Sequence, residues 1–203
     1  ATSYILSEAI KTIEKKEDMD MMQEMGVNAL RTCHYPNDER MLDLCDERGI
    51  MVWEENHARG LTLKQMQNSN FERQCKDCID EMIENHFNHP SIIIWGIMNE
   101  CSSDTPEGRE IFKKQFEQIK SLDKSRPLSF ASCKYFTDIC FDLVDIVSIN
   151  IYTGWYSSEG IESRKNRLKE WSRGVGGADV RQGGWRCHGR KAAGRPDRPL
   201  LRS

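Results

Sequence analysis

Hydrophobic and polar positions follow two different periods along the chain, and the change from one to the other separates helices from strands. Apolar residues recur every three or four positions where we expect helices, at residues 7–25, 37–48, 70–87, 107–122 and 159–171, with Asn37 capping the second. β-branched or large apolar residues run together where we expect strands, at residues 27–32, 50–53, 91–98, 128–132 and 146–151. This alternation predicts an α/β fold, a parallel sheet covered by helices.

Polar and aromatic side chains collect where four of these strands end: Arg31, His34 and Tyr35, then Glu54, Glu55 and His57, then Asn99 and Glu100, then Asn150, Tyr152 and Trp155. In a (β/α) barrel these ends face one crevice. An open doubly wound sheet is the rival fold, but no strand is followed by a G-x-G-x-x-G turn, which favours the barrel. We also expect strands 91–98 and 146–151 to be paired neighbours, with Glu100 and Tyr152 at the same end of the sheet.

Glu100 is the most informative of these residues. It follows a buried strand at the expected crevice, where we expect Trp53 and Trp95 beside it, and a poorly hydrated carboxyl there suits general acid catalysis. Glycoside hydrolysis uses two carboxyl groups, and aromatic residues stack on the sugar ring. The alternative, left open by spacing alone, is that Glu100 caps the next helix or pairs with Arg31.

Charge divides the chain unevenly. Residues 1–171 carry a net charge of −9, whereas residues 172–203 carry +6 and hold half of the fourteen glycines. We therefore expect a partial barrel domain at 1–171 and a Gly/Arg-rich tail at 172–203 that is disordered or the product of an altered reading frame. The rival interpretation is a nucleic-acid-binding arm, but such arms need several stacking aromatics and the tail has only Trp185, so we expect no nucleic-acid partner.

The remaining composition excludes several classes of protein. No apolar run approaches the roughly 18–20 residues that span a membrane, and Ala1–Lys16 lacks a signal-peptide pattern, so we expect a cytoplasmic protein without a membrane partner. The eight cysteines are scattered and are interpreted as reduced thiols. Cys75 and Cys78 form a C-x-x-C pair on the apolar stripe of a helix, which favours packing over zinc or redox chemistry. We expect no metal and no cofactor.

The segments GVNALRTCHYP (26–36), DERGIMVWEE (46–55) and NHPSIIIWGIMNE (88–100) resemble, in order and spacing, the catalytic-domain signatures of glycoside hydrolase family 2. NIYTGWY (150–156) resembles a later strand of the family, most closely in β-glucuronidase-like members. The resemblance covers about residues 7–171. It implies a partial (β/α)8 TIM barrel, about strands 2 to 6, and a retaining β-glycosidase of β-glucuronidase or β-galactosidase type with a β-glycoside substrate. It also implies that full-length relatives are homo-oligomers.

Roles follow from the resemblance residue by residue. Glu100 matches the catalytic acid/base, and Asn99 matches the residue that hydrogen-bonds the sugar 2-hydroxyl. The other substrate-site residues are Arg31 and His34 in the sugar-binding floor, Tyr152 as the tyrosine that hydrogen-bonds the nucleophile, and Trp155. For His34 a buried structural imidazole remains the alternative. Two departures are Cys33, where serine is usual, and Glu54, where aspartate is common.

The family's nucleophile is a glutamate at the end of the seventh strand. Residues 172–203 contain no glutamate and no β-branched run. We therefore expect a fragment that holds half of the catalytic pair and does not hydrolyse glycosides at a useful rate. The alternative is a non-catalytic remnant that binds sugar weakly or associates with itself. The sequence does not specify which sugar is preferred.

Overall fold

The structure is a computed structural model of the 203-residue chain, and it describes residues 15–134, 136–152, 160, 162–163, 165–167 and 169–170. The chain divides into two compact units, Ala1–Ser158 and Glu159–Ser203. The sheet lies in the first unit. In the second, the described residues between 162 and 170 are helical. The predicted tail at 172–203 lies outside the described residues.

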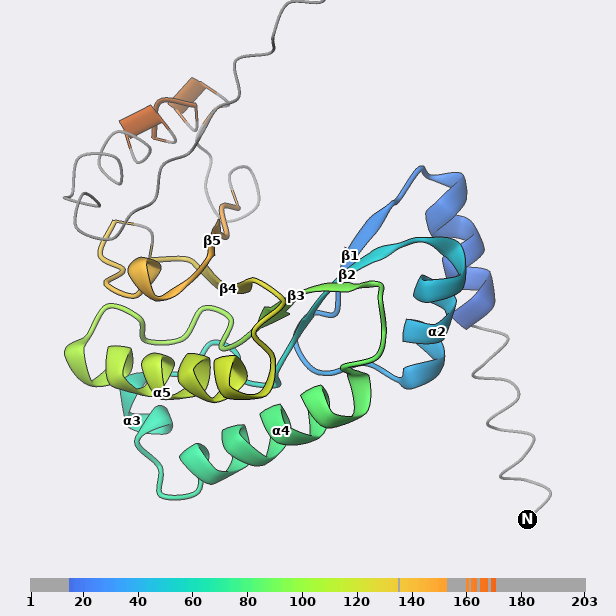
Figure 1. Cartoon of the computed structure of the whole chain (residues 1–203). Coiled ribbons are helices and arrows are strands. Elements are labelled where there is room, and N and C mark those ends of the chain that lie inside the picture. Colours follow the sequence, from blue (N-terminus) through green and yellow to red (C-terminus); the bar gives the residue numbers. More distant parts are fainter. Residues whose placement is uncertain are drawn as a thin grey trace, which may run out of the picture. The chain divides into compact units, whose positions relative to one another are not determined.

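Five parallel strands form one sheet in the order β1-β2-β3-β4-β5, as Figure 1 shows. They are β1 (Ala29–Arg31), β2 (Met51–Glu55), β3 (Ile92–Gly96), β4 (Leu128–Ser132) and β5 (Ile146–Ile149). Each strand pairs in parallel with the next along the chain, which confirms the partial (β/α) barrel. The expectation that strands 91–98 and 146–151 are paired neighbours is wrong, because β4 lies between β3 and β5.

The helices cover the sheet much as the periodicity predicts. They are the helical residues 15–24, then α2 (Glu39–Arg48), α3 (Leu63–Met66), α4 (Phe71–His86) and α5 (Pro106–Leu122), with a short 3₁₀ helix at Phe141–Leu143. α4 and α5 pack against each other on one side of the strands (Figure 1). The four-residue α3 was not expected, because it is too short to carry a helical period.

One predicted helix cap is corrected. The N-cap of α2 is Asp38, whose side chain accepts from the Arg40 N–H at 2.9 Å. Asn37 lies one residue earlier, and its side-chain oxygen accepts from the Asp38 N–H at 2.9 Å. Both residue types suit an N-cap, so neighbouring candidates cannot be separated by composition.

Trp95 lies in the core between the sheet and the helices. It is fully buried, and its indole N–H donates to Asp123 Oδ2 at 2.8 Å, at the C-cap of α5. The expectation that Trp95 lies beside Glu100 is therefore wrong. Successive residues of a strand face opposite sides, and Gly96, next in the chain, takes the side occupied by Trp53.

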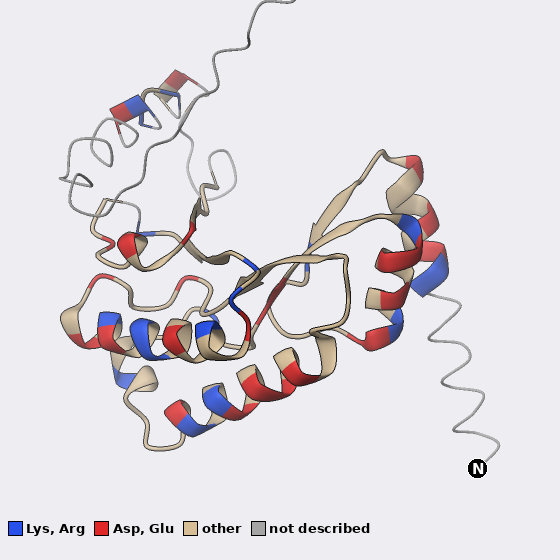
Figure 2. Cartoon of the chain, viewed as in Figure 1, with Lys and Arg blue, Asp and Glu red and all other residues tan. Residues whose placement is uncertain are grey.

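The helices show their charged faces outward. Figure 2 shows Lys, Arg, Asp and Glu along α4 and α5, while the strands are mostly uncharged. Cys75 and Cys78 both lie on α4; Cys75 is fully buried, and burial raises its pKa to about 12. The Cys75 side chain packs in the core, and Cys78 is partly buried. Among the described residues no helix is both long enough and apolar enough to cross a bilayer.

Candidate functional site

Glu55, the last residue of β2, is the centre of an ion-pair cluster at the carboxyl end of the sheet. Its side chain is fully buried. Arg31, the last residue of β1, places Nε and Nη2 at 2.8 and 2.7 Å from Glu55 Oε2. His34 Nδ1 lies 2.7 Å from Glu55 Oε1. Each oxygen of this carboxylate thus holds one cationic or titratable group, which fixes both side chains at the strand ends.

Trp53 forms the wall next to this cluster. The Arg31 guanidinium carbon lies 4.4 Å from the centre of the Trp53 ring. A Cβ on Gly96 would lie 2.1 Å from Trp53 Nε1 and 2.9 Å from Glu55 Cβ, so the indole can occupy this place only because residue 96 is glycine. The buried Trp53 N–H has no hydrogen-bond partner among the described residues.

A second group of polar side chains continues from Arg31 toward β3 and β5. Arg31 Nη2 donates to Asn99 Oδ1 at 2.9 Å, and Asn150 Nδ2 donates to the same oxygen at 3.0 Å. These two donors set the orientation of the Asn99 amide. Its Nδ2 therefore keeps two N–H groups without a partner among the described residues, and they can donate to a hydroxyl of a ligand.

Glu100 completes this network. Asn150 Nδ2 donates to Glu100 Oε1 at 2.7 Å, and Tyr152 Oη donates to the same oxygen at 3.1 Å. Oε2 has no partner among the described residues and can exchange a proton with a ligand. The two structural alternatives for Glu100 are not observed, because Arg31 pairs with Glu55 and the N-cap of α5 is Thr105.

The backbone that carries Glu100 is held in an unusual conformation. φ is +49° at Met98 and +54° at Glu100, values that cost a non-glycine residue about 1–3 kcal/mol each. Hydrogen bonds on both sides hold this segment: the Gly60 N–H donates to Asn99 O at 2.8 Å, and the Glu100 N–H donates to Ala131 O at 2.9 Å. The loop at Gly60 and strand β4 thus fix the backbone that carries the carboxyl group.

Glu54, although next to Glu55, does not belong to this site. It is fully buried, and His86 Nδ1 at the end of α4 lies 2.9 Å from Glu54 Oε1. Burial alone would lower the pKa of His86, but the Glu54 carboxylate outweighs it and raises this pKa. The Asn37 N–H also donates to Glu54 Oε1, at 3.0 Å. This pair links the sheet to α4.

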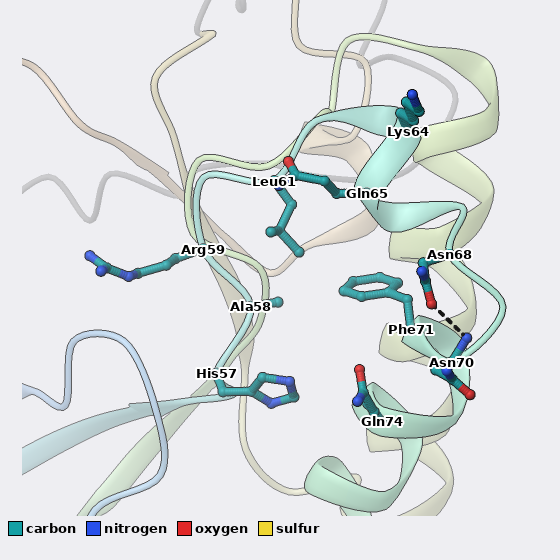
Figure 3. Close-up of a pocket in the computed structure, with 10 residues that line it drawn as sticks. All are labelled: His57, Ala58, Arg59, Leu61, Lys64, Gln65, Asn68, Asn70, Phe71 and Gln74. Atoms are coloured by element: carbon teal, nitrogen blue, oxygen red, sulfur yellow. Dashed lines mark hydrogen bonds between the residues drawn. The ribbon is translucent and has the colours of Figure 1, made fainter.

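A pocket of about 620 Å³ lies beside the β2–α4 connection (Figure 3). His57, Phe71 and Gln74 line it, and its charged lining residues, Arg59 and Lys64, are both basic. In Figure 3 the Arg59 side chain points away from the other lining residues. The backbone of Arg59 forms a parallel bridge with Asn99, so Arg59 stands next to the network described above.

The structure thus brings together most of the residues that the sequence singled out. Arg31, His34, Asn99, Glu100 and Tyr152 lie in two linked clusters, whereas Trp155 lies outside the described residues. Asn150, which the sequence places at a strand end without a role, connects Asn99 with Glu100. Its position immediately after an apolar, β-branched run was the available signal. Chemically, the arrangement offers a proton-exchanging carboxyl group beside amide and guanidinium donors, which suits a ligand rich in hydroxyl groups.

Comparisons with known proteins agree with this chemistry. The profile described as "Glycosyl hydrolases family 2, TIM barrel domain" matches residues 6–201. The β-glucuronidase of Mus musculus is 34% identical over 145 residues, which are 71% of this chain and 22% of that protein. The chain thus spans about a fifth of the length of the curated relatives it matches.

Solved structures give the same picture. A GH2 β-galacturonidase from Eisenbergiella tayi, bound to galacturonate, is 54% identical with a TM-score of 0.77, covering 79% of this chain and 29% of that one. The β-D-glucuronidase of Dictyoglomus thermophilum is 30% identical with a TM-score of 0.72, covering 79% of this chain and 30% of that one.

Proposed function

Since this chain belongs to the TIM-barrel domain of family 2 of the glycosyl hydrolases, we propose that its strand-end site is the acid/base half of a retaining β-hexuronidase, acting on a β-linked uronic acid. The observation that carries the proposal is the environment of Glu100. Two neutral donors hold one of its oxygens and leave the other without a partner among the described residues. A carboxyl held this way can protonate a glycosidic oxygen and then deprotonate water.

Asn99 and Arg31 place the sugar relative to Glu100. The free Asn99 amide N–H groups donate to a hydroxyl next to the reacting carbon, a contact that strengthens as charge develops in the oxocarbenium-like transition state. Arg31 orients that amide through its hydrogen bond to Oδ1. His34 and Glu55 hold the floor of the site.

Arg59 supports a negatively charged sugar. It is exposed, has no acidic partner among the described residues, and has its backbone paired with Asn99. Arg31, by contrast, is already neutralised by Glu55. The three relatives named above are two β-glucuronidases and a β-galacturonidase, all named for uronic acids. We assign the Arg59 guanidinium to the carboxylate of the uronate.

On its own this chain binds the sugar without turning it over. A retaining mechanism needs a second carboxylate about 5–5.5 Å from the first. Glu55 is poorly suited to that role, because Arg31 and His34 occupy both of its oxygens. The nucleophile is therefore expected from a longer form of the protein, in a strand that follows β5 and the next helix.

Binding tests the sugar class on the chain as it stands. Titration with galacturonate, glucuronate and galactose, followed by calorimetry, should show tighter binding of the uronates. Replacing Arg59 by Gln should weaken uronate binding about tenfold or more and leave galactose unchanged, since one charge-assisted hydrogen bond is lost. Lys64→Gln, a change of the same charge within the pocket, is the matched control. Equal binding of uronate and galactose would refute the uronate assignment.

Turnover tests the acid/base role on a form of the protein extended through the seventh and eighth strands. Glu100→Gln should reduce kcat by about 10²–10⁴-fold on a β-uronide with a poor leaving group. The loss should be much smaller with an aryl leaving group that departs without protonation. Glu107→Gln, at an exposed position of α5, is the control. Equal losses on both substrates would exclude Glu100 as the acid.

A further inference from the structure

Three different metal-ligating side chains meet at the edge of the Glu55 cluster. A ligand atom of each of Cys33, His34 and Glu55 lies within 4.8 Å of the others. They offer a thiol sulfur, an imidazole nitrogen and a carboxylate oxygen, which are the three ligand types that zinc takes in proteins. The remaining cluster of this kind among the described residues, Asp43, Asp46 and His89, offers no sulfur.

The geometry needs little adjustment to hold an ion. With Zn–S near 2.3 Å and Zn–N and Zn–O near 2.0–2.2 Å, tetrahedral ligand atoms stand roughly 3.3–3.6 Å apart. The atoms farthest apart must therefore close by about 1.5 Å at most, whereas His34 Nδ1 and Glu55 Oε1, 2.7 Å apart, must separate by less than about 1 Å. Cys33 is exposed and His34 is partly exposed, so both can move. Glu55 is buried and supplies the fixed point.

The two carboxylate oxygens of Glu55 have different partners. Oε2 is held by Arg31, whereas Oε1 faces only His34 among the described residues. A metal ion on Oε1 therefore replaces one hydrogen bond, that of His34, and leaves the guanidinium in place to orient the carboxylate from behind. The positive charge of Arg31 repels a metal cation and lowers the affinity of the site for it. We therefore expect reversible binding and no permanent structural metal.

From these contacts we infer that Cys33, His34 and Glu55 form a reversible binding site for a thiophilic divalent cation such as Zn²⁺. The ion takes Cys33 as a thiolate and releases the thiol proton to solvent, and water fills the fourth position. Binding is therefore weaker at acid pH, where protons compete with the metal for the Cys33 sulfur.

The site also has a consequence for sugar binding, which rests on the function proposed above. His34 and Glu55 belong to the floor of the proposed sugar site, so a metal ion there changes the groups that face the sugar. Zinc and uronate should bind in competition. Failure of this competition would count against the assigned sugar floor and leave the metal site intact.

Cobalt titration of the full chain tests the metal site directly. Co²⁺ replaces Zn²⁺ and, on a thiolate, gives an intense near-ultraviolet charge-transfer band that oxygen and nitrogen ligands do not give. We expect that band with one equivalent of Co²⁺ and its loss on adding Zn²⁺. Cys33→Ser should abolish the band and weaken Zn²⁺ binding at least about 100-fold, more than the loss of an outer-shell partner costs.

The controls separate this thiol from the others. Cys133→Ser removes another exposed cysteine, and Cys187→Ser removes the cysteine of the C-terminal segment; both should keep the band. His34→Gln should weaken Co²⁺ binding but retain a thiolate band. Circular dichroism verifies that each variant is folded. A band that survives Cys33→Ser, or disappears with Cys187→Ser, overturns the proposal.

Discussion

Glu54 and Glu55 are neighbours on β2, both fully buried and both against a histidine, yet they serve different regions of the molecule. Glu55 faces the strand-end site with Arg31 and His34. Glu54 faces the helix layer and pairs with His86. Adjacent residues of a strand point to opposite sides, so one dipeptide supplies both the floor of the site and a link between the sheet and α4.

The partners of the two carboxylates differ in their access to water. The side chains of Arg31 and His34 are 18% and 23% exposed, whereas that of His86 is 7% exposed. If Glu55 is removed, its partners can be rehydrated in the crevice. If Glu54 is removed, His86 remains buried without its carboxylate. The Glu54 pair should therefore matter for stability and the Glu55 cluster for binding.

The largest expected effect comes from Glu54→Ala. Breaking a buried pair by removing one partner costs about 3–5 kcal/mol, and we expect the free energy of unfolding to fall by that amount. Urea denaturation followed by circular dichroism measures it. Glu47→Ala, at an exposed position of α2, should change the free energy by less than about 0.5 kcal/mol. Equal effects of the two variants would mean that the Glu54–His86 pair contributes nothing.

Gly96→Ala should rank second and affect both properties at once. The new Cβ would lie 2.1 Å from Trp53 Nε1 and 2.9 Å from Glu55 Cβ, so the indole must move. We expect a loss of about 2–3 kcal/mol from overpacking, together with weaker sugar binding. At Gly160 a Cβ meets no atom within 4 Å, and Gly160→Ala should be nearly neutral. Unchanged uronate affinity in Gly96→Ala would show that Trp53 does not shape the site.

Glu55→Ala should cost less stability, about 1–2 kcal/mol, because water can reach Arg31 and His34. Its larger effect should be on uronate binding, measured by calorimetry, since both side chains lose their anchor. The two substitutions should therefore have opposite rankings in the two measurements. Glu54→Ala should reduce the free energy of unfolding more, and Glu55→Ala should reduce the affinity for uronate more. A variant pair with the reverse ranking would reject the division of roles.

The smallest effect is a pH dependence of stability. The pKa of His86 is raised in the folded state, so the pair is fully stabilising below the unfolded value near 6.5 and loses this contribution as pH rises through the folded pKa. The effect is small because burial opposes the Glu54 carboxylate. We expect the difference in unfolding free energy between the unmodified protein and His86→Gln to be larger at pH 5.5 than at pH 8.5. A difference that grows toward alkaline pH would contradict the assignment.

Much of the fold was predictable because it depends on local patterns. The strand at 128–132 has the limits expected from its apolar run, and the other strands and the long helices differ from expectation by a few residues at their ends. The positions of Arg31, His34, Asn99 and Glu100 at strand ends followed from the same patterns. Parallel strands bring such ends together whatever the intervening sequence, which is why this part of the site could be anticipated.

Local patterns could not predict the order of the strands in the sheet or the side of the sheet to which particular side chains point. β4 lies between β3 and β5. The three apolar runs are alike, so their residues do not indicate which two strands pair. Trp95 turns to Asp123 and the helix layer, and Asn150 joins Asn99 to Glu100. Each of these contacts joins residues 28 to 51 positions apart, where no local periodicity carries information.

The amino-acid sequence therefore settles which chemical groups stand at the ends of the strands, because strand limits and residue types are local properties. Which of those groups meet is a property of the folded sheet. A register irregularity between Val52 and Trp53 lies just before the residues that line the site. A shift of one residue exchanges the two faces of a strand. It is therefore this pairing with β3, set by long-range hydrogen bonds, that turns Glu55 to the strand-end site and Glu54 to the helices.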